Sequence, residues 1–211
     1  MKIEAVMFDC DGTIVDALSV AYKAEVTSIS TFGGNPPTME QFKRIAMTGG
    51  ITWEDIYRNY GVKDIPRALD MFYKLYHNAK FEMIPGAAYI VGKVRSKGLP
   101  ISLVSHDKNR EGIVKRLVSS GAYEYFEEEE INCATDSKSP IILRECKRIG
   151  VSPKNVLFIG DSVKDVRESK EAGCMSVAVI NEYSFHGYET IMPAEPLHII
   201  GRIGLLEALL G

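Results

Sequence analysis

The chain has 211 residues and a mass of 23.4 kDa, and its 45% hydrophobic and 25% charged residues are typical of a globular protein and exclude wholesale disorder. Lysine and arginine number 25 against 28 aspartates and glutamates, and this net charge of −3 argues against a protein that coats nucleic acid. No stretch approaches the roughly 20 apolar residues of a membrane span. Glu4 and Asp9 leave no room for a signal-peptide apolar region, so we expect a cytoplasmic protein with four reduced, space-filling cysteines.

Short apolar runs rich in β-branched residues predict the strands of a parallel sheet. They cover residues 3–8, 101–104, 156–159 and 176–180, with a weaker candidate at 131–134. Helical periodicity lies between them, over residues 87–96, 110–119, 140–149 and 163–172. Strands that alternate with helices and read as continuous apolar runs predict an α/β protein whose sheet is covered on both faces.

The segment from 16 to 81 interrupts this alternation. It shows only helical periodicity, with breaks at 33–37, at 48–50 and around Gly61, and the chain returns to the sheet through a hinge at 84–86. We therefore expect an all-helical unit, residues 16–81, inserted into a core made of residues 1–15 and 82–211. The pattern over 203–210 predicts a final helix packed on the core.

Two aspartates follow the first predicted strand, in the sequence Asp9-Cys10-Asp11-Gly12-Thr13. Strand alternation would send Asp9 and Asp11 to the same side, in the crevice where open α/β sheets bind ligands. Two neighbouring carboxylates repel each other, and a hard cation such as Mg²⁺ removes that conflict. The alternative is an ordinary surface turn built on Asp-Gly.

A second acidic pair, Asp161 and Asp165, follows the strand predicted at 156–159, where a helix begins. Negative charge is favoured at a helix N-terminus. The alternative is a helix cap at Asp161 with a solvated Asp165. If the two strands are neighbours, four carboxylates surround one point, and a divalent metal is the simplest explanation.

Ser105 and Lys138 are candidates for binding an anion. Ser105 ends the predicted strand at 101–104, where a hydroxyl and backbone N–H groups can hold phosphate oxygens. Lys138 precedes the proline that starts a helix. Taken singly, a serine there is usually a helix cap and a lysine is usually solvated, so their significance depends on the acidic pairs.

These four sites, in this order, resemble the haloacid dehalogenase superfamily of phosphatases over nearly the whole chain. The motifs that carry the likeness are D-x-D-G-T at 9–13, a hydrophobic strand ending in Ser105, the solitary Lys138, and G-D-x-x-x-D at 160–165. Residues 121–126 and 172–177 are similar to the phosphoglycolate-phosphatase-like branch. The resemblance implies a Rossmann-like core, a mobile helical cap at 16–81 and an obligatory Mg²⁺.

The resemblance also implies roles for individual residues. Asp9 would be the nucleophile and Asp11 the general acid and base. The metal would be bound by Asp161, the Asp9 carboxylate and the Asp11 backbone carbonyl, with Asp165 as a further ligand or a hydrogen-bonding partner. Ser105 and Lys138 would hold the phosphoryl oxygens. Ser139 departs from the family pattern, because many members of this branch have proline directly after the lysine.

The expected reaction is hydrolysis of a small phosphomonoester, with phosphoglycolate or a sugar phosphate as substrate. Asp11 counts against the dehalogenase and phosphonoacetaldehyde hydrolase branches of the superfamily. A phosphomutase would share every core residue, but the arginine-bearing cap motif of that branch is not found at 47–53. A non-catalytic phosphometabolite-binding protein is the third reading.

We expect no nucleic-acid or membrane partner, and a monomer or homodimer. The candidates to face the substrate are Lys43, Arg44, Trp53 and His77. The alternative is that these side chains lie on a helix surface or pack in the core.

Overall fold

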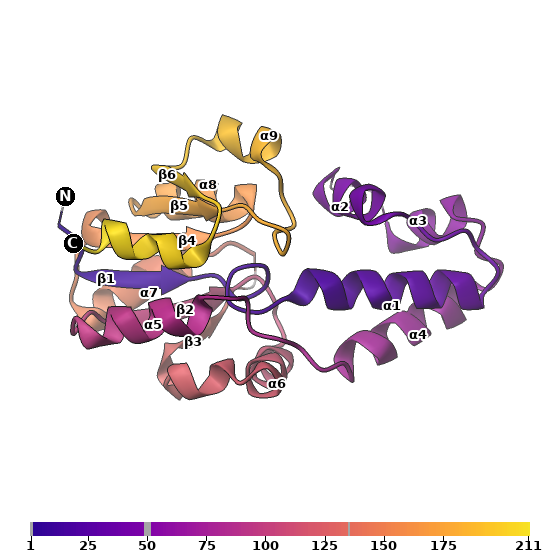
Figure 1. Cartoon of the computed structure of the whole chain (residues 1–211), viewed down its shortest axis with the longest axis horizontal. Helices are drawn as coiled ribbons and strands as arrows, with labels where there is room; N and C mark the ends of the chain where they lie inside the picture. The colour runs from indigo at the N-terminus through magenta and orange to yellow at the C-terminus, as the bar shows by residue number, and fades with distance from the viewer. Residues whose placement is uncertain (1, 49–51, 135) are drawn as a thin grey trace. The chain divides into compact units, whose positions relative to one another are not determined.

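The computed structural model describes residues 2–48, 52–134 and 136–211. The chain folds into two compact units, one made of residues 1–16 and 81–211 and the other of residues 17–80 (Figure 1). In the described part of the chain, no helix is long and apolar enough to cross a membrane.

The first unit is built on a six-stranded, all-parallel sheet in the order β3-β2-β1-β4-β5-β6. The strands are β1 (Ala5–Phe8), β2 (Ile101–Ser105), β3 (Ile131–Cys133), β4 (Val156–Gly160), β5 (Met175–Val179) and β6 (His198–Ile200). The five predicted strands are confirmed, including the weaker candidate at 131–134. The sequence did not predict the edge strand β6.

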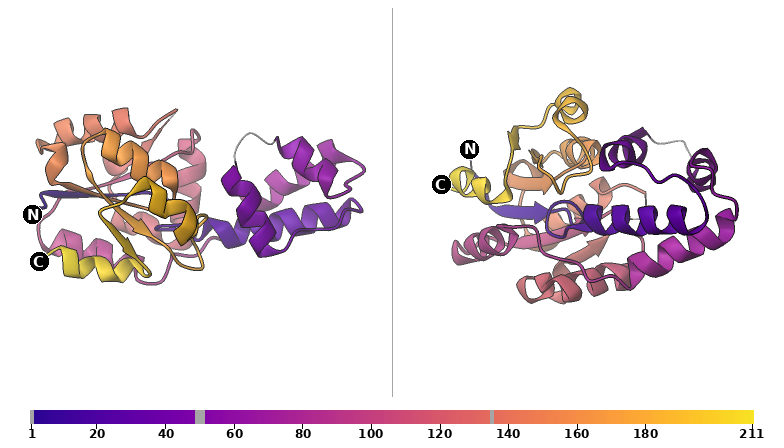
Figure 2. Two further views of the ribbon diagram at one scale, coloured as in Figure 1. Left: turned by 90° about the horizontal axis from the view of Figure 1, so that it is seen from above. Right: turned by 45° about the vertical axis from the view of Figure 1, so that its right-hand side comes forward.

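Helices cover both faces of the sheet, as predicted for strands that are buried throughout. Figure 2 shows α7 and α8 on one face, and α5 with the C-terminal 3₁₀ helix on the other. The helices of this unit are α5 (Ala87–Ser96), α6 (Arg110–Ser120), α7 (Ser139–Ile149), α8 (Val163–Glu171) and α9 (Tyr188–Ile191). Short 3₁₀ helices occupy Ala122–Tyr125, Glu128–Glu130, Pro153–Asn155, Met192–Ala194 and Ile203–Leu209. The final helix expected at 203–210 is therefore present in 3₁₀ form.

One face of the sheet packs against α7 through a continuous apolar cluster. Met7, Val104 and Phe158 from three strands lie against Ile142 of α7 in this cluster. Cys146 and Cys174 belong to the same cluster, and Cys10 is also buried, as expected for cysteines that fill space in a core. Cys133 is only half-buried. This packing fixes the strands whose ends carry the polar residues.

The order of the strands brings those ends together. β1 lies between β2 and β4, and its last residue, Phe8, is in register with Leu103 and Ile159. The chain reaches β2 on one side of β1 and β4 on the other, so the strand order reverses at β1. The carboxyl edge at such a reversal is where open α/β sheets bind ligands. The segments that follow β1, β2 and β4 therefore meet at one edge.

The second unit is made of helices α1 (Ala17–Thr31), α2 (Met39–Thr48), α3 (Trp53–Asn59) and α4 (Ile65–His77). Figure 1 shows α4 running beside α1. The predicted breaks at 33–37 and at Gly61 separate α1 from α2 and α3 from α4. The break predicted at 48–50 lies mostly outside the described residues. The all-helical character expected of this segment is confirmed for the described residues.

A buried carboxyl group lies in the core of the helical unit. Glu25 is 1% exposed, and its Oε2 accepts a hydrogen bond of 3.0 Å from the hydroxyl of the equally buried Tyr57. Burial raises the pKa of Glu25 to about 7, and the Tyr57 hydrogen bond opposes this rise only in part. Ionised Glu25 is thus less stable in the folded unit than in the unfolded chain.

We expect Glu25→Gln to remove a loss of stability that the wild type shows at alkaline pH. A carboxyl whose pKa is raised on folding stabilises the fold fully below its unfolded pKa, and that contribution is lost as pH rises through about 7. The wild-type free energy of unfolding should fall by about 2–3 kcal/mol from this group between pH 5 and pH 9, and that of the variant should not. Trp53 is the only tryptophan, so its fluorescence reports unfolding of this unit. Glu54→Gln, at an exposed position, is the control; parallel pH profiles of Glu25→Gln and wild type would contradict the prediction.

Candidate active site

A buried lysine joins two of the predicted acidic residues. The Nζ of Lys138 lies 2.5 Å from Oδ1 of Asp9 and 2.5 Å from Oδ1 of Asp165. All three residues are at least nine-tenths buried, and the Lys138 side chain is 1% exposed. The ammonium group also lies 5.5 Å from the centroid of the Phe158 ring. Lys138 is thus not a solvated surface lysine, and the first and last predicted motifs meet at its head group.

Asp161 completes a group of three carboxylates with Asp9 and Asp165. One oxygen atom from each of the three lies within 4.8 Å of the others. Oδ2 of Asp161 accepts a hydrogen bond of 2.6 Å from the backbone N–H of Phe185, in the loop after β5. The two separated stretches that the sequence singled out therefore meet at one point.

The start of α8 fixes Asp165. Ser162, not Asp161, is the N-cap, and its hydroxyl accepts a hydrogen bond of 3.1 Å from the backbone N–H of Asp165. Oδ2 of Asp165 accepts in return from the N–H and the hydroxyl of Ser162, at 3.0 and 2.6 Å. This reciprocal capping box leaves Oδ1 for Lys138. The alternative of a capping Asp161 with a solvated Asp165 is wrong.

Burial and mutual repulsion decide the ionisation of this group. Burial and the charge of Asp165 together raise the pKa of Asp9 to about 7, against the opposing effect of Lys138. Burial and the charge of Asp9 raise the pKa of Asp161 well above its usual range. Although burial opposes ionisation of Asp165, Lys138 and the bonds from Ser162 hold its pKa below the usual value. Asp9 and Asp161 are therefore the carboxylates whose charges lack compensation.

The donor set fits a divalent cation. Three ionised carboxylates and one ammonium group leave two negative charges without a cation among these four residues. All the donors are oxygens, which Mg²⁺ and Ca²⁺ prefer. Both oxygens of Asp165 already accept hydrogen bonds, so Asp9 and Asp161 are the carboxylates best suited to hold the ion directly.

Asp11 does not join the three carboxylates. Asp9 is still paired with β4 through its backbone N–H, but the carbonyl of Cys10 accepts from Ile14 and Val15 at 2.8 and 3.0 Å, so the chain turns directly after Asp9. The strand alternation that predicted Asp9 and Asp11 on the same side ends at this turn. The prediction that four carboxylates surround one point is therefore wrong, because three of them do. The Asp11 carboxylate lies instead against the guanidinium of Arg116.

Gly12 allows this turn to pass close to the acidic group. Its φ of +82° is one that residues with a side chain rarely adopt. A Cβ atom at this position would also collide with the carboxylate of Asp161. The glycine of the predicted motif thus brings the backbone after Asp11 against the second acidic strand end.

Ser105 is buried at the end of β2, and its Oγ accepts a hydrogen bond of 3.1 Å from the backbone N–H of Asp107.

Sequence reasoning did not single out several residues around the predicted ones. Glu168 accepts from the backbone N–H of Lys138 at 2.7 Å and lies 2.9 Å from Nε2 of His106. Arg116 and Phe185 were also missed, since an arginine within a helix and a backbone N–H in a loop carry no local signal.

Comparison with known proteins agrees with this geometry. The family model described as haloacid dehalogenase-like hydrolase matches residues 6–179. Among curated proteins, a candidate pyrophosphatase of Clostridium perfringens is 25% identical over 84% of each chain. The phosphoglycolate phosphatase of Escherichia coli K12 is 24% identical over 87% of this chain and 83% of its own.

A solved structure has the same fold. The crystal structure of a HAD family hydrolase from Deinococcus radiodurans R1, with bound phosphate and sodium, superposes with a TM-score of 0.85 at 19% identity. The superposition covers 99% of this chain and 95% of that one. Since the family model spans both acidic strand ends and the lysine between them, the chain belongs to the haloacid dehalogenase-like hydrolase family.

Proposed function

We propose that this protein is a Mg²⁺-dependent phosphatase that hydrolyses a small phosphomonoester through an aspartyl phosphate on Asp9. The observation that carries the proposal is the buried Lys138 between Asp9 and Asp165, with Asp161 beside them. Membership of a hydrolase family supports it, as do relatives named phosphoglycolate phosphatase and pyrophosphatase.

Asp9 is the nucleophile in this proposal. One of its oxygens attacks phosphorus, and the bond from phosphorus to the leaving oxygen breaks. Lys138 holds Oδ1 of Asp9 at 2.5 Å, which limits rotation of the carboxylate and orients the attacking group. A covalent intermediate divides one difficult displacement into two easier steps. Water then releases phosphate and restores the Asp9 carboxylate.

Asp11 transfers the protons of both steps. Protonated Asp11 gives its proton to the departing alkoxide, and the resulting carboxylate takes a proton from the attacking water. Burial raises the pKa of Asp11, which favours the protonated form, while Arg116 opposes this shift. General acid–base assistance of this kind contributes about 10²–10⁴-fold to a rate.

Asp9 and Asp161 would hold the Mg²⁺, with the backbone carbonyl of Asp11 as a further ligand. Bound there, the ion would neutralise charge on the transferring phosphoryl oxygens, which is most of the catalytic task in phosphoryl transfer. The Lys138 ammonium contributes positive charge at the same place, and Ser105 offers a hydroxyl at the neighbouring strand end.

Phosphoglycolate or a sugar phosphate is the substrate that we propose. The name of the Escherichia coli relative supports the first of these.

No observation in the described residues favours a phosphomutase or a non-catalytic binding protein over a phosphatase. The cap motif that would distinguish a mutase falls partly outside those residues. Cytoplasmic location, a monomeric or dimeric state, and a lack of nucleic-acid and membrane partners stay predictions from the sequence.

The test is phosphate release from a panel of phosphorylated metabolites, measured in Mg²⁺ and in EDTA. We expect release in Mg²⁺, loss of activity in EDTA and recovery when Mg²⁺ is added back. Asp161→Asn should raise the Mg²⁺ concentration for half-maximal activity at least about 10-fold, because it removes a charged ligand of the ion. Even the loss of a residue that only hydrogen-bonds to a metal ligand commonly lowers metal affinity about 10-fold or more. Activity that is equal in Mg²⁺ and in excess EDTA would exclude the proposed metal dependence.

A further inference from the structure

A buried arginine, Arg116, grips the carboxylate of Asp11. Its Nε lies 3.0 Å from Oδ1 of Asp11, and its Nη2 donates a hydrogen bond of 3.1 Å to Oδ2. The Arg116 side chain is 3% exposed and that of Asp11 is 24% exposed. One hydrogen bond and a second close nitrogen–oxygen contact of the ion pair together restrict the orientation of the carboxylate as well as its position.

A second carboxylate fixes the arginine. Oδ2 of Asp107 accepts a hydrogen bond of 2.8 Å from the same Nη2 of Arg116. Asp107 is itself anchored, because its backbone N–H donates to Ser105 and its Oδ1 accepts from the backbone N–H of Asn109 at 2.8 Å. The guanidinium is therefore tied through Asp107 to the end of β2. Asp11 is held at a defined distance from that strand end.

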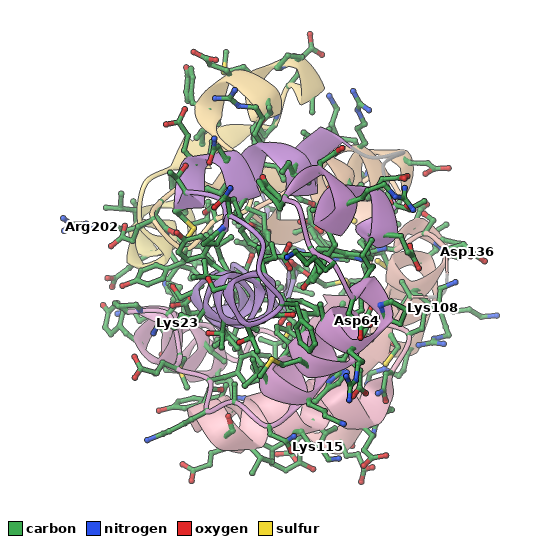
Figure 3. All side chains as sticks on the ribbon, turned by 90° about the vertical axis from the view of Figure 1, so that its right-hand side faces the viewer. Lys23, Asp64, Lys108, Lys115, Asp136 and Arg202 are labelled. Carbon is green, nitrogen blue, oxygen red and sulfur yellow. The ribbon has the colours of Figure 1, made fainter. Side chains whose placement is uncertain are left out.

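Arg116 and its neighbour Lys115 lie in different surroundings on helix α6. Side chains on a helix point back toward its N-terminus, and the position one turn before Arg116 is Gly112. A Cβ atom at Gly112 would lie 3.2 Å from Nδ2 of Asn109 and in ordinary van der Waals contact, at 3.6 Å, with Nη1 of Arg116. Lys115, the residue before Arg116, lies on the outer side of α6 (Figure 3). Its side chain is 67% exposed and forms an ion pair with Glu111.

We propose that Arg116 is a positioning residue that holds the Asp11 carboxyl group in the orientation needed to exchange protons with the leaving group and with water. This inference rests on the proposed function. Each carboxylate oxygen has a second lone pair, so a proton can bind where Arg116 does not. The Asp11 side chain is 24% exposed, so Arg116 does not seal it from solvent. Arg116 transfers no proton itself, because a guanidinium stays charged at every relevant pH.

The test compares leaving groups in Arg116→Lys, which keeps the positive charge but cannot contact both oxygens of Asp11 and Asp107 together through one planar group. An alkoxide needs a proton as it departs, whereas p-nitrophenolate does not. We expect kcat/KM for an alkyl phosphomonoester to fall about 10–100-fold, as part of the general-acid contribution, and kcat/KM for p-nitrophenyl phosphate to fall less than about threefold. An equal fall for both substrates would show a merely structural role and overturn the proposal. Lys115→Gln, one position away on the same helix, should leave the ratio unchanged.

A second readout requires no turnover. Unfolding midpoints of Arg116→Gln, Asp11→Asn and the double variant form a cycle that measures the coupling of the two residues. We expect the unfolding midpoint of the double variant to fall by less than the sum of the two single falls. Additive falls would show that Arg116 and Asp11 do not interact, and would overturn the proposal. Should the wild type release phosphate from neither substrate, the proposed function fails. The midpoints then decide separately whether Arg116 holds Asp11.

Discussion

Asp9→Asn is expected to lower kcat for phosphomonoester hydrolysis by at least about 10⁴-fold, because an amide cannot form the phosphoryl intermediate. The fold should survive this change. An asparagine Oδ1 can still accept from Lys138, and the substitution removes a carboxylate that burial and Asp165 destabilise. Since the pKa of Asp9 is raised to about 7, its ionisation costs stability as pH rises through that value, and the variant avoids this cost.

Activity and stability therefore change in opposite directions in this variant. In EDTA at pH 8, the unfolding midpoint of Asp9→Asn should equal or exceed that of the wild type. The matched control is Asp70→Asn, which removes an exposed carboxylate that pairs with Lys74 on the surface of α4 and should leave activity intact. Phosphate release undiminished in Asp9→Asn would refute the nucleophile assignment, and a folding defect would refute the account of its pKa.

The sequence predicted the sheet well because its strands are short apolar runs that are buried on both faces. Each of the four stronger candidates matched a strand within two residues. β6 was missed for a physical reason. His198–Ile200 is a three-residue edge strand whose first residue is exposed, so it lacks the buried run that distinguishes a strand from a loop.

The candidate site was predictable where a motif stays on a regular element and unpredictable where the chain leaves one. Asp9 ends the ladder of β1 and Asp165 lies on α8, so both positions followed from periodicity. Asp11 lies past the turn at Cys10, where alternation no longer determines direction. Arg116 was missed because a basic residue on a helix is usually exposed, and only the tertiary contacts with Asp11 and Asp107 distinguish it from Lys115.

Lys138→Met is expected to destabilise the protein in EDTA at pH 8 by about 3–5 kcal/mol, the usual result of removing one partner from a buried ion pair. Lys138 is 1% exposed and contacts two carboxylates at 2.5 Å, so methionine fills the space but leaves Asp9, Asp161 and Asp165 without an ammonium group. The pKa values of all three acids would rise without it, that of Asp165 from below its usual value. Because a raised pKa lowers stability as pH increases through it, the loss should shrink when the pH falls below about 5.

Magnesium provides the decisive comparison for this variant. An ion that binds only the folded protein stabilises it by about 2.7 kcal/mol at 100 times its dissociation constant, so Mg²⁺ should recover much of the loss at pH 8 and little at pH 5, where protonated carboxyls bind it poorly. Denaturant unfolding in the four combinations of pH and cation measures this directly. Lys147→Met, at an exposed position on α7, should change none of them by more than about 0.5 kcal/mol. If Lys138→Met matched the wild type in EDTA at pH 8, the carboxylates would not be ionised together there, and the site would have no charge for a divalent cation to balance.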